Sequence, residues 1–190
     1  IGPICVAASS GSGKSTYCRR LVDEILDMAK IRVEQNDNGD YEYQYPDEEK
    51  KETKKESKPV SAPERLKIRG VYLLTAAKST DPVFESMPPI RLDIDDAMQN
   101  GVQIEDFRNS VVVFDDFKNK SREFKTKSDW VDALRTDLLD KSRKLGIHLL
   151  ICNHRQRAGH ETALENIEAQ AFVVFYRSNK NETRKLLKNY

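Results

Sequence analysis

Five short apolar runs recur along the chain, and most are separated by segments with a helical pattern. The runs are rich in β-branched and aromatic residues and are continuous rather than alternating, which is typical of strands buried on both faces. We expect strands at residues 3–8, 71–75, 111–114, 147–152 and 171–176. Runs of this kind predict a mainly parallel sheet.

Helices are expected at residues 15–30, 128–145 and 160–169. In the first, apolar residues recur at the i, i+3, i+4 and i+7 spacing of one helix face. Ser128 and Asp129 suit the start of the second helix, and Gly146 suits its end. Strands that alternate with helices predict an α/β fold, a three-layer sandwich around a mainly parallel five-stranded core sheet.

Residues 35–63 interrupt this pattern because they are polar, charged and nearly devoid of aliphatic side chains. Tyrosines alternate with polar residues at positions 41–45, directly after Asn38-Gly39, which is typical of a short exposed hairpin. Residues 47–58 are almost all Glu and Lys, as in a disordered stretch or in a solvated helix held by Glu–Lys pairs. We expect one domain over residues 1–190, with a charged, flexible insertion at 35–63.

The composition excludes several classes of protein. The 190 residues include 32 basic and 31 acidic side chains, a net charge of +1, so a globally basic nucleic-acid binder is not indicated, although local patches remain open. No apolar run approaches the ~18 residues of a membrane helix, and we expect no membrane span. The chain starts in a strand-like run without a Met, and we expect it to be a domain of a longer protein.

The three cysteines, Cys5, Cys18 and Cys152, are widely spaced and form no CxxC motif. An odd number with no pairing framework favours a reducing compartment. We expect all three to act as small buried hydrophobic residues.

A phosphate-binding loop is predicted between the first strand and the first helix. Residues 8–16 fit the motif G-x-x-x-x-G-K-[ST], with Ala8 in place of the first glycine. Gly11 and Gly13 let the backbone turn and approach an anion, and the N–H groups of the loop and of the helix N-terminus then point at the phosphates. Lys14, expected to be a solvated cation, would contact the β- and γ-phosphates, and the Ser15 hydroxyl would bind Mg²⁺. We expect ATP and Mg²⁺ as ligands, with the nucleotide bound by Ser9, Ser10, Gly11, Ser12, Gly13, Lys14, Ser15 and Thr16.

Polar side chains follow two of the predicted strands. Asp115 and Asp116 come directly after the third strand, at the sheet edge where open α/β sheets bind ligands. Asp115 would hold Mg²⁺, directly or through water, and Asp116 would act as the general base on the attacking water. The fourth strand ends in Asn153-His154, and we favour the Asn153 amide as the group that orients water or senses the γ-phosphate.

Basic residues gather in two places. The first group is Lys118, Lys120, Arg122, Lys125 and Lys127, and the one acidic residue among them is Glu123. It is either a solvated face or a contact for the phosphate backbone of a nucleic acid. The second group flanks the fourth strand and offers arginine fingers for a neighbour's active site. It consists of Arg143, Lys144, Arg155 and Arg157.

Together, the phosphate loop, the first strand and the Cys152-Asn153 strand tip resemble the viral DNA-packaging ATPases of the poxvirus and giant-virus type, within the FtsK–HerA superfamily. The matching stretches are residues 4–17, 71–84 with Thr80-Asp81-Pro82, 112–117 and 139–153. Ser142-Arg143-Lys144 stands where the family carries Gly-Arg-His, and Asn153 stands where it usually has Gln. Relatives often carry Arg-x-Asn-Ile after the fourth strand, but residues 164–167 lack the Arg, which leaves Arg143, Arg155 and Arg157 as finger candidates.

The resemblance implies a P-loop NTPase of the RecA/FtsK-like ASCE type that couples ATP hydrolysis to translocation of double-stranded DNA. It also implies a homo-oligomeric ring in which an Arg enters a neighbour's site, with Arg143 as our choice among the three candidates, and contacts with capsid or portal-vertex proteins. The location it implies is the host cytoplasm at the viral assembly site, or the virion. Two other functions remain open. One is a small-molecule or nucleotide kinase, which the lack of Arg in the insertion before Arg65 disfavours, and the other is a nucleotide-dependent switch.

Overall fold

A six-stranded, entirely parallel sheet forms the centre of the fold, in the order β5-β4-β6-β7-β1-β8. The computed structural model describes residues 2–7, 11–45, 68–75, 81–87, 89–115, 125–153 and 171–174 of the chain. The strands are β1 (Ile4–Ala7), β4 (Val71–Thr75), β5 (Ile90–Arg91), β6 (Val111–Asp115), β7 (His148–Asn153) and β8 (Ala171–Val174). The predicted α/β class with a five-stranded parallel core is therefore confirmed, and β5 adds a short edge strand that was not predicted.

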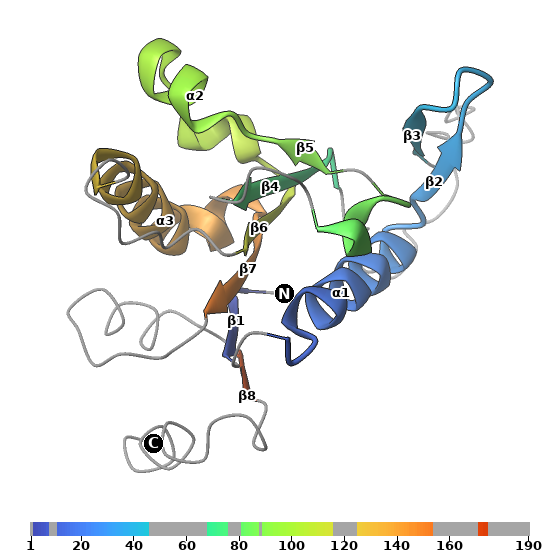
Figure 1. The fold of residues 1–190 in the computed structure, drawn as a ribbon, viewed down its shortest axis with the longest axis horizontal. Helices are drawn as coiled ribbons and strands as arrows, with labels where there is room; N and C mark the ends of the chain where they lie inside the picture. Colours follow the sequence, from blue (N-terminus) through green and yellow to red (C-terminus); the bar gives the residue numbers. More distant parts are fainter. Residues whose placement is uncertain are drawn as a thin grey trace, which may run out of the picture.

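Helices cover both faces of this sheet, with α1 (Lys14–Met28) on one side and α3 (Lys125–Leu145) on the other (Figure 1). Shorter elements join each layer, namely η1 (Pro82–Phe84) beside α1, and α2 (Ile94–Asn100) and η2 (Ile104–Phe107) beside α3. None of the described helices is long and apolar enough to cross a membrane.

The two long helices match their predicted positions with one error. The first helix is confirmed to within two residues at each end, and Gly146 follows α3 with φ 67°, a conformation that suits glycine. The predicted start of the second helix is wrong, because α3 already includes Lys125 and places Ser128 and Asp129 inside its first turns. Capping preferences favour Ser and Asp at a helix start, but they do not exclude them from the interior. The third predicted helix, residues 160–169, lies outside the described residues.

Alternate residues of each strand enter opposite halves of the core. In β6, Val111 and Val113 pack in the cluster that contains α1, whereas Val112 and Phe114 pack in the cluster that contains α3. Every residue of β6 is buried. This burial on both faces explains why the strand is a continuous apolar run rather than an alternating one.

The predicted hairpin is present, as β2 (Arg32–Gln35) and β3 (Tyr41–Gln44) in a separate antiparallel sheet that projects beyond α1 (Figure 1). The Asn36 side chain accepts hydrogen bonds from two backbone N–H groups of the turn. The hairpin is only partly exposed, because Val33 and Tyr43 pack against the core cluster of α1, and burial raises the pKa of Tyr43 to about 12. Residues 47–58 lie outside the described residues.

Candidate functional site at the carboxyl edge of the sheet

Three neighbouring strands bring their carboxyl ends to the same edge of the sheet. Strand β7 lies between β1 and β6, and parallel register places Ala7 beside Asn153 and Phe114 beside Ile151. The segment that enters the phosphate loop, the last residue of β7 and Asp115 therefore gather at one edge, where open parallel sheets bind ligands.

Two glycines shape the part of the phosphate loop that the structure describes. Gly11 and Gly13 have φ of 71° and 87°, in the left-handed region that only glycine enters readily. An added Cβ at either position would meet no atom within 4 Å, so it is the backbone conformation that requires glycine. Gly13 directly precedes α1 and supplies no capping side chain, so a bound anion can take the place of a cap at this helix N-terminus.

Ser15 and Asp115 meet across this edge although 100 residues separate them. The Ser15 hydroxyl donates a hydrogen bond of 3.1 Å to Oδ2 of Asp115. Ser15 lies in the first turn of α1, and Asp115 is the last residue of β6 and is 8% exposed. The contact joins the phosphate loop to the carboxylate that the sequence assigned to the metal.

This pair suits a magnesium ion that arrives with a nucleotide. Mg²⁺ in nucleotide sites is usually bound by one or two protein oxygens together with phosphates and water, rather than by a cage of protein ligands. Within the described part of the chain, no group of three or more His, Cys, Asp and Glu side chains could hold a metal. Phosphate oxygens would therefore complete the coordination of an ion held by Ser15 and Asp115.

Lys14 differs from its expected environment. The sequence predicts a solvated cation, but Lys14 is only 6% exposed. The positive charge of Lys14 lowers the pKa of the buried Cys152 thiol, and the negative charge of Asp115 raises it. Both charged groups therefore lie near Cys152. The prediction was wrong because the motif specifies the residue type of the loop, whereas the packing of α1 against the sheet decides its burial.

Other predicted site residues are placed only in part. Asn153 ends β7 at the carboxyl edge, although the structure describes no more than its backbone. Arg143 is exposed in the last turn of α3, two residues before the end of the helix. Since α3 ends just before β7 begins, Arg143 lies at the opposite edge, about 20 Å away for a six-residue strand. Ser9, Ser10 and Asp116 lie outside the described residues, as do residues 117–124 and 154–157.

Two of the three cysteines form a contact that the sequence did not reveal. All three are buried, as predicted. Cys18 of α1 and Cys152 of β7 bring their Sγ atoms to 2.9 Å. The hydrogen bond with Cys18 is the main cause that holds the pKa of Cys152 well above its ordinary value, and burial adds to it.

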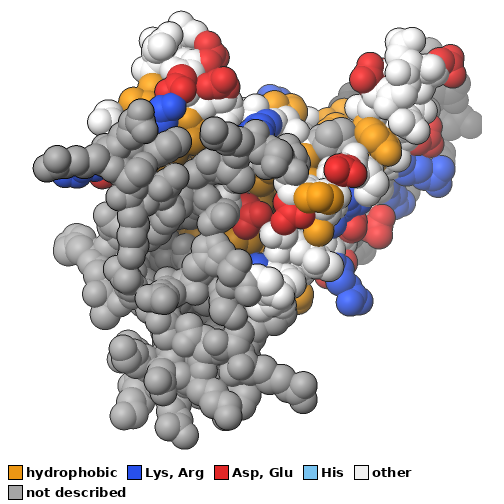
Figure 2. Space-filling model, in the orientation of Figure 1, with side chains coloured by type: hydrophobic (Ala, Val, Ile, Leu, Met, Phe, Trp, Pro, Cys, Tyr) orange, Lys and Arg blue, Asp and Glu red, His pale blue; other side chains and the backbone are white. Residues whose placement is uncertain are grey.

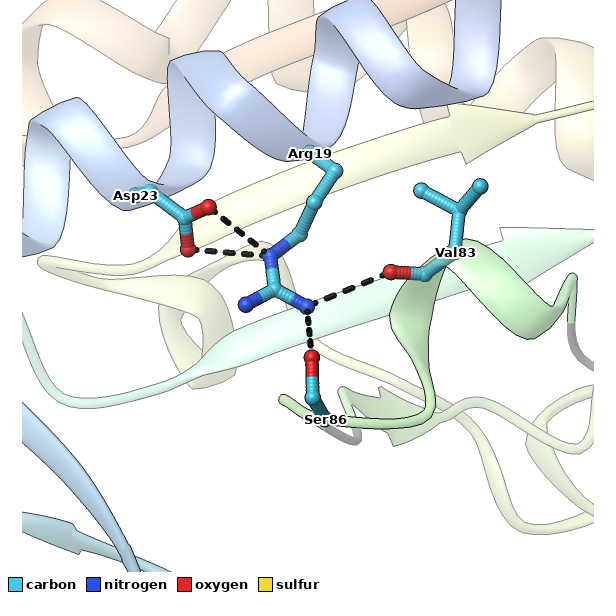
Figure 3. Close-up of polar contacts among 4 residues, drawn as sticks. All are labelled: Arg19, Asp23, Val83 and Ser86. Carbon is cyan, nitrogen blue, oxygen red and sulfur yellow. Dashed lines mark hydrogen bonds and ion pairs between the residues drawn. The ribbon is translucent and has the colours of Figure 1, made fainter.

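Arg19 is a further residue that sequence reasoning missed (Figure 3). Its guanidinium bonds to Asp23 at 2.9 Å and donates to the carbonyl of Val83 at 3.2 Å and to the hydroxyl of Ser86 at 3.0 Å. These bonds tie α1 to the segment that follows β4. The i, i+4 Arg–Asp spacing on α1 signals the ion pair, but nothing in the sequence signals the contact with residues 83–86.

No family model matches the chain, and no curated protein sequence matches it significantly. The case for a nucleotide site therefore rests on the sequence motif and on the geometry at this edge.

Proposed function

We propose that this chain is an ATP-hydrolysing motor domain, and more specifically a DNA translocase of the viral genome-packaging type. The observation that carries the proposal is the Ser15–Asp115 hydrogen bond, because it joins a phosphate-loop hydroxyl to the carboxylate at the end of a neighbouring buried strand. A strand and a loop with left-handed glycines precede that hydroxyl, and the amphipathic helix α1 begins beside it, which is the context that a phosphate loop requires.

Within the P-loop class, we assign the fold to the RecA/FtsK-like ASCE type because of the position of β7. Its tip lies beside the strand that leads into the phosphate loop and next to the strand that ends in Asp115. A polar residue at that tip, Asn153, can therefore lie near the γ-phosphate and orient the attacking water. A hydrolase can use such a group to orient the attacking water.

Each residue has a role in this proposal. The backbone N–H groups of the loop and of the α1 N-terminus bind the phosphates, and Lys14 places its positive charge against them. Ser15 and Asp115 would hold Mg²⁺, which would supply positive charge against the phosphate oxygens. Asp116 accepts a proton from the attacking water, and Asn153 orients that water.

The surface charge limits where DNA would bind. Figure 2 shows acidic side chains on α2 and on the β2–β3 hairpin. The hairpin carries one basic and four acidic residues between Arg32 and Gln44, and Asp93, Asp95 and Asp96 lie exposed at the start of α2. Both surfaces repel a polyanion. The basic segment at residues 117–128, which directly follows β6, is the better candidate for contact with the phosphate backbone.

Substitution of the two neighbouring carboxylates tests hydrolysis. Asp116→Asn should retain ATP and Mg²⁺ binding but lose about 10²–10⁴-fold in turnover, because an amide cannot accept the proton. Asp115→Asn should weaken Mg²⁺-dependent binding as well, because it removes a metal ligand. Steady-state release of phosphate and nucleotide titrations measure the two effects, with Asp137→Asn on the exposed face of α3 as the control.

The fate of the γ-phosphate distinguishes an ATP-driven motor from a kinase and from a nucleotide-dependent switch. Free phosphate whose release rises with duplex DNA supports the motor. Transfer of phosphate to a small acceptor would indicate a kinase, and nucleotide binding without turnover would indicate a switch. If Asp116→Asn lowers ATP turnover by less than tenfold, Asp116 is not the general base.

A salt titration tests the DNA contact. Lys127 already pairs with Asp95 of α2, so the better targets are Lys118, Lys120 and Arg122. Changing these three to Ser should flatten the dependence of log K on log salt by up to ~3, since each neutralised phosphate contributes ~0.9. DNA-stimulated ATPase should fall while basal ATPase stays unchanged. The control changes Lys141 and Lys144, which are exposed on α3, to Ser. An unchanged slope would place the DNA contact elsewhere.

A further inference from the structure

We propose that Cys18 and Cys152 form a site of oxidative modification, at which a disulfide forms between α1 and β7 beside the nucleotide edge. The disulfide itself does not depend on the proposed function. The expected effect of the disulfide on ATP turnover rests on the proposed function, whereas peptide mapping detects the disulfide independently of any activity.

The geometry of the two thiols supports the proposal. Their Sγ atoms are 2.9 Å apart, so they must close by about 0.9 Å to reach the ~2.0 Å of a disulfide bond. Cys18 belongs to a helix and Cys152 to a central strand, so both are carried by packed elements. Residues 134 positions apart thus lie closer than two unbonded sulfur atoms normally do.

Only one pairing is available to the chain, which has three cysteines in all. Cys5 packs in the core cluster on the α3 side of the sheet, whereas Cys18 and Cys152 pack in the cluster on the α1 side. The sheet therefore separates Cys5 from the other two. This arrangement makes Cys5 an internal control for the reactivity of a buried cysteine in the same protein.

Cys18 and Cys152 lie close in the chain to residues of the proposed nucleotide site. Cys18 lies one helical turn beyond Lys14, and Cys152 directly precedes Asn153. A disulfide would draw the first turns of α1 and the tip of β7 together and hold them there. A displacement of about 1 Å in a catalytic arrangement can cost roughly 100-fold in rate. The oxidised protein should therefore turn over ATP at least tenfold more slowly than the reduced protein.

A peroxide is a sufficient oxidant. One sulfur attacks a peroxide oxygen and forms a sulfenic acid, and the departing hydroxide takes up the thiol proton to leave as water. The second sulfur then attacks the first, the S–S bond forms and the S–O bond breaks, and a second water leaves. Each sulfur loses one electron, and hydrogen peroxide gains two. Cys18 and Cys152 are 0% and 2% exposed, so a small neutral oxidant should react faster than a bulky disulfide such as oxidised glutathione.

Peptide mapping of the whole chain after treatment with hydrogen peroxide tests the modification. We expect a Cys18–Cys152 cross-linked peptide, a loss of two hydrogen atoms, and a thermal midpoint raised by several degrees, all reversed by dithiothreitol. Cys5→Ala should behave in the same way, whereas Cys18→Ala and Cys152→Ala should form no cross-link. Circular dichroism before oxidation verifies that each variant is folded.

The outcomes separate this proposal from the proposed function. Absence of the cross-link in folded, oxidised protein would overturn the modification site, whatever the ATPase activity. A cross-link that leaves ATP turnover unchanged would overturn the effect on catalysis. If the reduced protein does not hydrolyse ATP at all, the proposed function fails, while the peptide map and the thermal midpoint still test the disulfide.

Discussion

Lys14 and Asp115 are two charged side chains that the fold buries at the carboxyl edge of the sheet. Removal of a charged group from water costs free energy unless an opposite charge or hydrogen bonds compensate. Asp115 accepts a hydrogen bond from Ser15. The negative charge of Asp115 raises the pKa of the Cys152 thiol, whereas the positive charge of Lys14 lowers it. This edge of the sheet therefore holds two opposite charges that are largely removed from water, which is the arrangement that the proposed hydrolysis would require.

Tyr43 leads to a prediction about alkaline pH. Burial raises its pKa to about 12, whereas the unfolded value is 10.0. A raised pKa stabilises the fold fully below pH 10, and that stability is lost as the pH rises from about 10 to 12. The loss should be of order 2 kcal/mol in the free energy of unfolding.

Urea unfolding of the wild type and of Tyr43→Phe between pH 9 and 12 measures this loss. The variant should show the shallower decline with pH, because it lacks the titrating phenol. Tyr41→Phe is the control, because it removes a phenol from the same hairpin strand, β3. Equal declines in the wild type and Tyr43→Phe would show that another group controls alkaline unfolding.

At the scale of elements, α1 connects several features. Its N-terminus follows the phosphate loop, its apolar face packs in the core, and Arg19 bonds to the segment after β4 (Figure 3). Since β4 is the neighbour of β6, whose last residue is Asp115, α1 is bonded to the segment that follows a strand next to β6. Thr75, the last residue of β4, pairs in register with Asp115 and is also buried.

Arg19→Ala should destabilise the protein by about 1–2 kcal/mol. The expected loss comes mainly from the hydrogen bonds to Val83 and Ser86, because a partly exposed i, i+4 ion pair such as Arg19–Asp23 contributes less than about 1 kcal/mol. Arg20→Ala is a matched control on the same helix, since Arg20 is 80% exposed and its ion pair among the described residues is with Glu24 at 3.5 Å. Urea unfolding should show little change in this control. Equal losses in the two variants would mean that the Arg19 bonds to residues 83–86 add nothing.

At the scale of the whole molecule, the residues proposed for hydrolysis lie at two opposite edges of the sheet. The phosphate loop and Asp115 lie at the carboxyl edge, whereas Arg143 lies near the amino edge at the end of α3. The length of β7 separates Arg143 from the site of its own chain. If Arg143 takes part in hydrolysis, it must therefore act on another subunit.

Mixing experiments test this arrangement. Arg143→Ala should lower turnover only in assemblies, and mixtures with wild-type protein should lose more activity than in proportion to the dose, because one variant subunit disables a neighbour's site. Lys144→Ala, the adjacent exposed residue, serves as the control. Loss in strict proportion to the dose would contradict a role in trans.

Local patterns in the sequence determined much of the fold. The phosphate-loop motif, the five core strands and α1 could be predicted because each depends on a short stretch of chain: glycines at fixed spacing, a continuous apolar run, or a helical stripe. Patterns that only express a preference were less reliable. The start of α3 was misplaced because Ser and Asp favour a helix start without requiring one, and the two residues of β5 are too few to form a pattern.

Only the tertiary structure decided how these pieces meet. Burial on both faces identifies a strand as central, but it does not say which strand is its neighbour, so the position of β7 between β1 and β6 could not be predicted. The Ser15–Asp115 bond and the Cys18–Cys152 contact join residues 100 and 134 positions apart. The burial of Lys14 likewise follows from how α1 packs on the sheet. Periodicity assigns a residue to a face of its own element, whereas a contact between elements depends on strand order and packing, which a local pattern does not contain.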